Sequence, residues 1–152
     1  MQAGAVGSTP RNRSMSANAQ TVLVVEDDAA VRELVARLMQ RAGYAVLKAR
    51  HSDEALYFSV EFTGSIHLLI TDLCMAPHFN GRRLAEMIRR DRPDIRVLYI
   101  SGFVDDDAVV TEIELGLAHF LPKPFTPEIL LESVRLAMAE PAMRIGNSVQ
   151  ES

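Results

Sequence analysis

The chain has a single cysteine, Cys74, and this excludes an internal disulfide and a zinc site built from cysteines. No apolar run approaches the roughly 20 residues that a membrane-spanning helix needs, and the amino-terminal residues lack the apolar stretch of a secretory signal. The chain also lacks an excess of positive charge, because its net charge is −4, whereas a general nucleic-acid binder is usually basic. We therefore expect a protein of a reducing, cytoplasmic compartment, with no membrane insertion and no direct nucleic acid binding.

Short apolar runs alternate with amphipathic helical patterns along the chain. Strand-like runs occupy residues 21–26, 44–47, 66–71, 95–100 and 118–121, and helical patterns follow them over 31–39, 52–62, 82–90, 105–115 and 127–138. This alternation implies right-handed βαβ units and therefore a doubly wound α/β fold, with a five-stranded parallel sheet and helices on both faces. We expect a disordered tail over 1–20, one domain over 21–140 and a flexible tail over 141–152.

Cap signals and apolar spacing define the helices more closely. Asp28 and Thr126 are predicted N-caps, and Gly43 follows the first helix where a left-handed C-cap is expected. His51 or Ser52 opens the second helix. Each helix repeats apolar residues at a spacing of three or four, which predicts the side that faces the core. The residues predicted to face inward include Leu34, Leu38, Leu56, Tyr57, Val60, Ile129 and Leu130.

Polar residues follow four of the predicted strands at the point where each one ends. The first strand ends in Glu26 and Asp27, and the third ends in Asp72, where an apolar run meets a carboxylate. An unpaired charge is costly inside a strand buried on both faces, so Asp72 should mark the point where the strand opens onto solvent or an ion. Ser101 ends the fourth strand and Lys123 follows the fifth. Because ligands bind outside the carboxyl ends of parallel strands, we expect these side chains to form one site.

The residue types at this edge suit phosphoryl transfer. Three clustered carboxylates raise one another's pKa values or recruit a cation, and oxygen ligands with a high negative charge suit Mg²⁺. Lys123 supplies a positive charge and Ser101 a hydroxyl, which are the groups that hold the oxygens of a transferred phosphoryl group. One carboxylate is then free to act as the nucleophile and form an aspartyl phosphate, and Asp72 is the best placed.

Four short motifs resemble those of the receiver domains of two-component response regulators. The segment Val24-Val25-Glu26-Asp27-Asp28 is similar to the family's acidic pair, and its phosphoacceptor motif is similar to Asp72-Leu73-Cys74-Met75, followed by Pro77 and Gly81. The other two motifs match Ser101-Gly102 and Lys123-Pro124-Phe125. The longer segments Ser101-Gly102-Phe103 and Leu121-Pro122-Lys123-Pro124-Phe125 also resemble the receivers of hybrid histidine kinases. The resemblance covers about residues 20–140 and implies a flavodoxin-like sheet with strand order 2-1-3-4-5.

The resemblance implies a role for each residue of the site. Asp72 would accept the phosphoryl group from a histidine kinase or a histidine phosphotransfer protein. Asp27, Asp72 and the backbone carbonyl of Cys74 would ligate Mg²⁺ directly, and Glu26 would act through water. Lys123 would contact the phosphoryl group.

The same resemblance implies a switch and a cis peptide bond. Ser101 would swing toward the phosphoryl group and Phe120 would rotate inward with it, a population shift that the new charge biases. The bond between Lys123 and Pro124 would be cis, which is uncommon. The fourth helix, the fifth strand and the fifth helix would then bind an unknown downstream protein. On this interpretation the chain is a stand-alone regulator, not an enzyme, and catalyses only its own phosphorylation and dephosphorylation.

The sequence departs from the family pattern at two places and leaves other functions open. Ala76 makes the loop after the acceptor one residue longer, and the acidic pair begins with Glu26 instead of the commoner aspartate. An Mg²⁺-dependent phosphohydrolase with an aspartate nucleophile is an alternative, although such enzymes usually need an acid where Cys74 stands. A flavin or nucleotide binder would need a glycine-rich loop after the first strand, where acids stand instead. A receiver-like binding module that is not phosphorylated is the remaining alternative.

Overall fold

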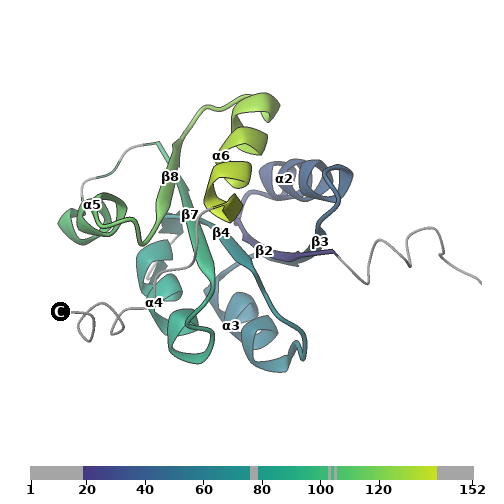
Figure 1. The fold of residues 1–152 in the computed structure, drawn as a ribbon, viewed down its shortest axis with the longest axis horizontal. Coiled ribbons are helices and arrows are strands. Elements are labelled where there is room, and N and C mark those ends of the chain that lie inside the picture. Colours follow the sequence, from purple (N-terminus) through teal and green to yellow (C-terminus); the bar gives the residue numbers. More distant parts are fainter. Residues whose placement is uncertain (1–18, 76–78, 103, 105, 140–152) are drawn as a thin grey trace, which may run out of the picture.

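A five-stranded parallel sheet forms the centre of the molecule (Figure 1). The computed structural model describes residues 19–75, 79–102, 104 and 106–139. The strands are β2 (Thr21–Val25), β3 (Ala45–Ala49), β4 (Leu68–Asp72), β7 (Arg96–Ser101) and β8 (His119–Pro122). Their order across the sheet is β3-β2-β4-β7-β8, which is 2-1-3-4-5 in chain order and confirms the predicted doubly wound, flavodoxin-like arrangement.

Helices cover both faces of this sheet (Figure 1). The described helices are α2 (Ala29–Arg41), α3 (Ser52–Glu61), α4 (Gly81–Asp91), α5 (Asp107–Glu114) and α6 (Pro127–Ala139). On one face, α2 and α6 pack on the strands through buried residues such as Val35 and Leu130. On the other face, α3, α4 and α5 pack through buried residues such as Ala55, Leu84 and Val109. The sheet therefore separates two hydrophobic cores.

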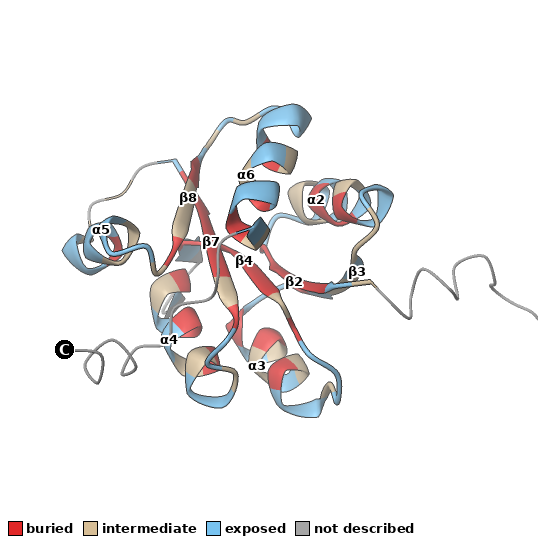
Figure 2. Ribbon diagram, viewed as in Figure 1, coloured by how far each residue is buried: buried red, intermediate tan, exposed pale blue. Residues whose placement is uncertain are grey.

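The strands β2 and β4 are buried on both faces, and they form part of the red centre of Figure 2. Successive side chains of a strand point to opposite faces. Val22 and Val24 of β2 therefore join the core under α2 and α6, whereas Leu23 and Val25 join the core under α3, α4 and α5. Burial on both faces is the reason why these strands appear in the sequence as continuous apolar runs.

The predicted caps are confirmed at the ends of three helices. The Oδ1 of Asp28 accepts two backbone N–H groups from the first turn of α2, at 2.9 and 3.1 Å. The Nδ1 of His51 accepts a backbone N–H of α3 at 3.2 Å, and the Oγ1 of Thr126 does the same for α6 at 3.2 Å. Gly43 follows α2 with φ at 101°, the left-handed conformation that its C-cap position requires.

The apolar spacing is wrong about four residues that it assigns to the core. Tyr57 and Val60 on α3 are 62% and 68% exposed. Leu34 on α2 and Ile129 on α6 are 43% and 52% exposed. Each of these helices packs on the sheet along a narrow stripe, and the apolar pattern extends beyond that stripe. On α3 the buried positions belong instead to small residues, including Ser59.

A short hairpin replaces the loop expected after β4. The strand β5 (Cys74–Met75) pairs antiparallel with β6 (Phe79–Asn80), and Asn80 caps α4 by accepting a backbone N–H at 2.8 Å. Ala76, the residue expected to lengthen this loop, lies outside the described residues, as do residues 1–18 and the predicted tail over 141–152. Among the helices that are described, none has the length and apolar character that crossing a membrane requires.

Candidate functional site

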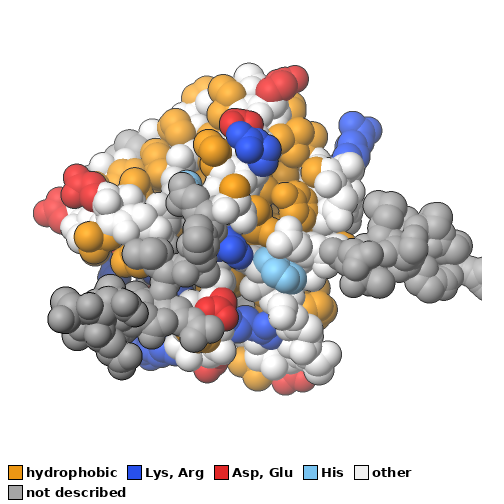
Figure 3. Space-filling view, viewed as in Figure 1, with side chains coloured by type: hydrophobic (Ala, Val, Ile, Leu, Met, Phe, Trp, Pro, Cys, Tyr) orange, Lys and Arg blue, Asp and Glu red, His pale blue; other side chains and the backbone are white. Residues whose placement is uncertain are grey.

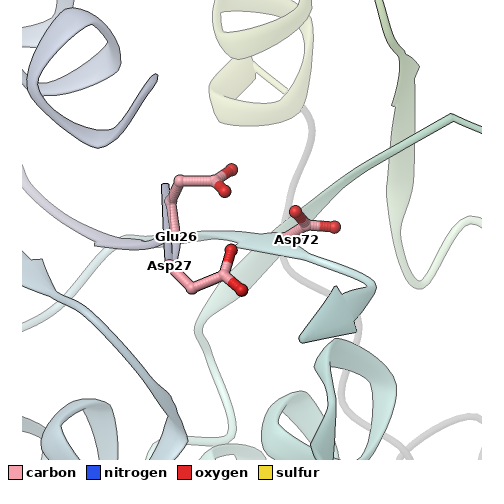
Figure 4. Close-up of side chains that lie close together, drawn as sticks. All are labelled: Glu26, Asp27 and Asp72. Atoms are coloured by element: carbon pink, nitrogen blue, oxygen red, sulfur yellow. The ribbon is translucent and has the colours of Figure 1, made fainter. Parts of the chain in front are cut away.

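Three carboxylates converge at the carboxyl edge of the sheet, as Figure 4 shows. Glu26 directly follows β2, where its backbone N–H donates to the carbonyl of Ala49 at 3.1 Å, and Asp27 is the next residue. Asp72 is the last residue of the neighbouring strand β4. One carboxylate oxygen from each of these three acids lies within 4.8 Å of the others. The parallel pairing of β2 and β4 thus brings together acids that are distant in the sequence.

Lys123 places an ammonium group against two of these acids. Its Nζ lies 3.0 Å from Oδ2 of Asp72 and 3.5 Å from Oε1 of Glu26. The side chain comes from the segment after β8, where the backbone N–H of Lys123 donates to the carbonyl of Ser101 at 2.8 Å. The bond between Lys123 and Pro124 is cis, as the resemblance implies. The end of β7 and the segment after β8 therefore fix the ammonium group beside Asp72.

Asp72 accepts a hydrogen bond on each of its carboxylate oxygens. The ammonium of Lys123 contacts Oδ2, and the backbone N–H of Cys74 donates to Oδ1 at 3.0 Å. The Asp72 side chain is only 9% exposed. The prediction that the strand ends at Asp72 is confirmed, but the carboxylate faces Lys123 more than solvent. The ammonium and the amide offset the cost of burying this charge.

The other predicted residues lie around this centre. Ser101 ends β7 and is buried, and its Oγ lies 4.0 Å from the Sγ of the exposed Cys74. Phe120 is half-buried on β8, where it pairs in register with Tyr99 of β7 and packs against the core under α3, α4 and α5. The structure thus places Ser101 beside the residue that contacts Asp72 and leaves Phe120 on the neighbouring strand.

Negative charge is in excess at this edge. Burial raises the pKa of Glu26 to about 7, and the charge of Asp72 adds to that effect, whereas the N–H of Asp28 and the Lys123 ammonium oppose it. Burial by itself would lower the pKa of Lys123, but the carboxylates that it contacts raise this pKa by more. The one ammonium of Lys123 contacts two of the three carboxylates, and such an all-oxygen donor set fits a hard divalent cation such as Mg²⁺.

Gly81 begins α4 directly against the acidic centre. A Cβ at this position would overlap the backbone carbonyl oxygen of Asp72 and crowd the side chain of Thr71. The N–H of Gly81 donates to the carbonyl of Leu73 at 2.9 Å, which holds the start of the helix at this close distance. Only glycine fits such an approach. The phosphoacceptor motif includes Gly81, but the steric reason becomes visible only in the structure.

Arg32 is a residue at this edge that no sequence pattern indicates. It lies on α2, and its Nη1 donates to the backbone carbonyl of Glu26 at 2.9 Å. None of the four motifs contains Arg32, and its partner is a backbone atom, which carries no sequence signal. Its position one turn into the helix that follows the acidic pair is the only hint that the sequence offers.

Comparison with known proteins agrees with this geometry. A family model described as the response regulator receiver domain matches residues 22–135. The chain belongs to the response regulator receiver family. This receiver is 35% identical over 115 residues to the sensor kinase CckA of Brucella abortus. It is also 31% identical over 120 residues to the chemotaxis protein CheY1 of Helicobacter pylori.

The relatives differ in how much of their length the receiver matches. The alignments cover 76% of this chain for CckA and 77% for CheY1, but the chain spans only 12% of CckA and 95% of CheY1. Among solved structures, the receiver domain of the hybrid histidine kinase CckA is 36% identical, with a TM-score of 0.64 over 78% of this chain and 98% of that one. The chemotaxis protein CheY4 of Vibrio cholerae is 26% identical, with a TM-score of 0.69 over 78% of this chain and 98% of CheY4.

Proposed function

We propose that this receiver is a single-domain response regulator that accepts a phosphoryl group on Asp72 from a histidine kinase or a histidine phosphotransfer protein. The observation that carries the proposal is the contact of Lys123 with Asp72, at 3.0 Å, within a cluster of three carboxylates. An oxygen of Asp72 attacks phosphorus while the bond from phosphorus to the donor nitrogen breaks. The ammonium of Lys123 is then free to move onto a phosphoryl oxygen and stabilise its negative charge.

The acidic cluster would hold Mg²⁺ during this transfer. In this proposal the direct ligands are Asp27, Asp72 and the backbone carbonyl of Cys74, and Glu26 acts through water. When bound, the ion neutralises the negative charge of the carboxylates and of the phosphoryl oxygens. The hydrogen bond from the Cys74 N–H to Oδ1 of Asp72 supports this arrangement, because it orients the carboxylate at the end of β4.

Ser101 and Phe120 form the switch in this proposal. The phosphoryl oxygens draw the Ser101 hydroxyl toward them, and Phe120 turns inward on β8 as a consequence. The downstream partner would bind the surface of α5, β8 and α6. Figure 3 supports this surface, because hydrophobic side chains lie over α6 and toward α5. The exposed large apolar residues here are Val110 on α5, Leu115 directly after it, and Ile129 and Leu136 on α6.

Membership of the receiver family favours a regulator over an enzyme that turns over external substrates. The phosphohydrolase alternative would need a second acid where Cys74 stands. A receiver-like binding module that is not phosphorylated is the second candidate. The domain bounds 21–140, the stand-alone state, a cytoplasmic location and the lack of direct nucleic acid binding stay predictions. The similarity to the receiver of CckA also fits a chain that is the detached equivalent of a hybrid kinase's receiver.

Intact mass after incubation with acetyl phosphate tests the proposal. The wild type should gain one phosphoryl group in Mg²⁺ and none in EDTA, and Asp72→Asn should gain none in either. The matched control Asp53→Asn removes an exposed acid from α3 and should behave as the wild type does. Equal labelling of Asp72→Asn and wild type would overturn the proposal. No gain by the wild type would favour the unphosphorylated binding module.

A further inference from the structure

Arg32 connects α2 to the acidic pair that follows β2. It is the fourth residue of α2, and its backbone N–H donates to the carbonyl of Asp28 at 2.9 Å, as the start of a helix requires. Its half-buried side chain folds back toward the helix N-terminus, the direction that long helical side chains prefer. There Nη1 donates to the carbonyl of Glu26 at 2.9 Å, a charge-assisted hydrogen bond.

This contact fixes the peptide unit between the two acids. The N–H of Glu26 is already held by the sheet, through the carbonyl of Ala49 at 3.1 Å. Arg32 holds the carbonyl on the other side of Glu26. A peptide unit is planar, so fixing this carbonyl also fixes the nitrogen and Cα of Asp27. Rotation about the N–Cα bond of Asp27 still remains, and the N–H of Asp28, which donates to Oε2 of Glu26 at 3.1 Å, restrains it from the other side. Arg32 therefore holds one of the two peptide units that set the direction of the exposed Asp27 side chain.

We propose that Arg32 is a positioning residue for the metal site, which orients the Asp27 carboxylate toward Glu26 and Asp72 by holding the carbonyl of Glu26. The inference rests on the proposed function, because it concerns the Mg²⁺ that this function requires. The role of Arg32 differs from that of Lys123, which contacts two carboxylates directly. Because Arg32 contacts a carbonyl, it orders the site and leaves the carboxylates for the cation.

The sign of the effect on Mg²⁺ affinity separates positioning from simple electrostatics. Arg32 carries a positive charge near a cation site, so its charge alone repels Mg²⁺ and its removal should tighten binding. A positioning role predicts the opposite, because a misdirected Asp27 is a poorer ligand. A purely structural role, in which Arg32 only satisfies a buried carbonyl, predicts lower stability with unchanged affinity for Mg²⁺.

Calorimetric titration of the full chain with MgCl₂, without a phosphodonor, tests the proposal. The solution is held at about pH 8, above the pKa of Glu26. Arg32→Met, which removes the donor and the charge, should weaken Mg²⁺ binding by about tenfold. The matched control Arg37→Met removes the same charge from an exposed position of the same helix, and its affinity should stay within about twofold of the wild type.

Two further measurements keep the result decisive. Circular dichroism should show that Arg32→Met is folded without Mg²⁺, and Arg32→Lys, which keeps the charge and one donor, should have an intermediate affinity. If Arg32→Met does not fold, Arg32→Lys decides, since wild-type affinity in that variant overturns the positioning role. Affinity of Arg32→Met equal to or tighter than that of Arg37→Met also overturns it. Failure of the wild type to bind Mg²⁺ would instead overturn the proposed function itself.

Discussion

Two charged clusters of this receiver use similar side chains but differ in their balance of charge. The first, the acidic edge, comprises Glu26, Asp27, Asp72 and Lys123. The second, the helix tether, comprises Arg89 of α4, Tyr99 of β7 and Glu112 of α5. At the acidic edge one ammonium contacts the three-carboxylate cluster, and the Arg32 guanidinium contacts only a backbone carbonyl. The tether has one carboxylate for one guanidinium and a phenol.

In the helix tether the single negative charge has two donors and one positive charge beside it. The hydroxyl of Tyr99 donates to Oε1 of Glu112 at 2.7 Å, and Nη1 of Arg89 donates to the same oxygen at 3.3 Å. The Nη2 of Arg89 also donates to the carbonyl of Leu117 at 2.8 Å. Val109 is the one residue of α5 that is fully buried. The tether therefore attaches a helix that has little apolar contact of its own.

The difference separates a cluster that stabilises the fold from one that suits the proposed function. A buried carboxylate with a full set of partners strengthens the fold, but a surplus of carboxylates weakens it. Burial raises the pKa of Glu26 to about 7, and the charge of Asp72 adds to this cost at the acidic edge. Proteins tolerate such a loss of stability at sites where a bound ligand supplies the opposite charge. The surplus of carboxylates supports the proposed cation site at the acidic edge, and the tether has no such surplus.

The largest expected effect is a pH dependence that comes from Glu26. Its pKa rises from 4.5 to about 7 in the folded state, so the folded chain binds more protons than the unfolded chain between these values. The free energy of unfolding should therefore fall as pH rises through this window, by up to about 3 kcal/mol. Urea unfolding in EDTA measures it as the difference between wild type and Glu26→Gln. A difference that does not change with pH would contradict the raised pKa of the buried Glu26.

Breaking the helix tether should have the next largest effect. Glu112→Ala leaves the Tyr99 hydroxyl and the Arg89 guanidinium without their shared acceptor. The site is largely buried, since the Arg89 and Glu112 side chains are only 12% and 14% exposed. We expect a loss of about 2 kcal/mol of unfolding free energy. The control Glu114→Ala changes an exposed acid of the same helix and should stay within about 0.5 kcal/mol of wild type. Equal effects of the two variants would show that the tether does not hold α5.

Removing only the phenol hydroxyl of the tether should have a smaller effect. Burial raises the pKa of Tyr99, and the charge of Glu112 raises it further, so the hydroxyl stays protonated and donates at all ordinary pH values. Tyr99→Phe should lower the unfolding free energy by about 1 kcal/mol. Tyr57→Phe, at a residue that is 62% exposed, is the matched control and should change little. If the Tyr99→Phe variant is as stable as this control, the Tyr99 hydroxyl does not contribute to the tether.

The smallest effect is expected at a second ion pair, which joins α4 to the N-cap residue of α5. The Nε of Arg82 lies 3.4 Å from Oδ2 of Asp106, without the geometry of a hydrogen bond, and the two side chains are 28% and 39% exposed. Arg82→Gln should therefore cost less than about 0.5 kcal/mol, and salt should abolish this cost. Urea unfolding at low and high ionic strength measures both. A larger, salt-independent loss would mean that this pair belongs with the tether.

Local patterns in the sequence predicted the elements and the acids of the site. Short apolar runs identify strands, and a carboxylate at the end of such a run, as at Asp72, identifies the edge. The order of the strands followed from the resemblance. The apolar spacing failed at Tyr57 and Val60, because it does not show how wide a stripe the sheet covers. The contacts of Arg32 and Tyr99 could not be predicted, since each depends on how elements pack in space.

The most direct test compares the acidic edge and the helix tether in one experiment. Glu26→Gln and Glu112→Gln each remove one negative charge and keep the size of the side chain. In EDTA at about pH 8, urea unfolding should show that Glu26→Gln is more stable than the wild type and Glu112→Gln less stable. Added Mg²⁺ should stabilise the wild type more than it stabilises Glu26→Gln. Equal losses of stability in both variants, with no response of the wild type to Mg²⁺, would contradict the difference between the two clusters.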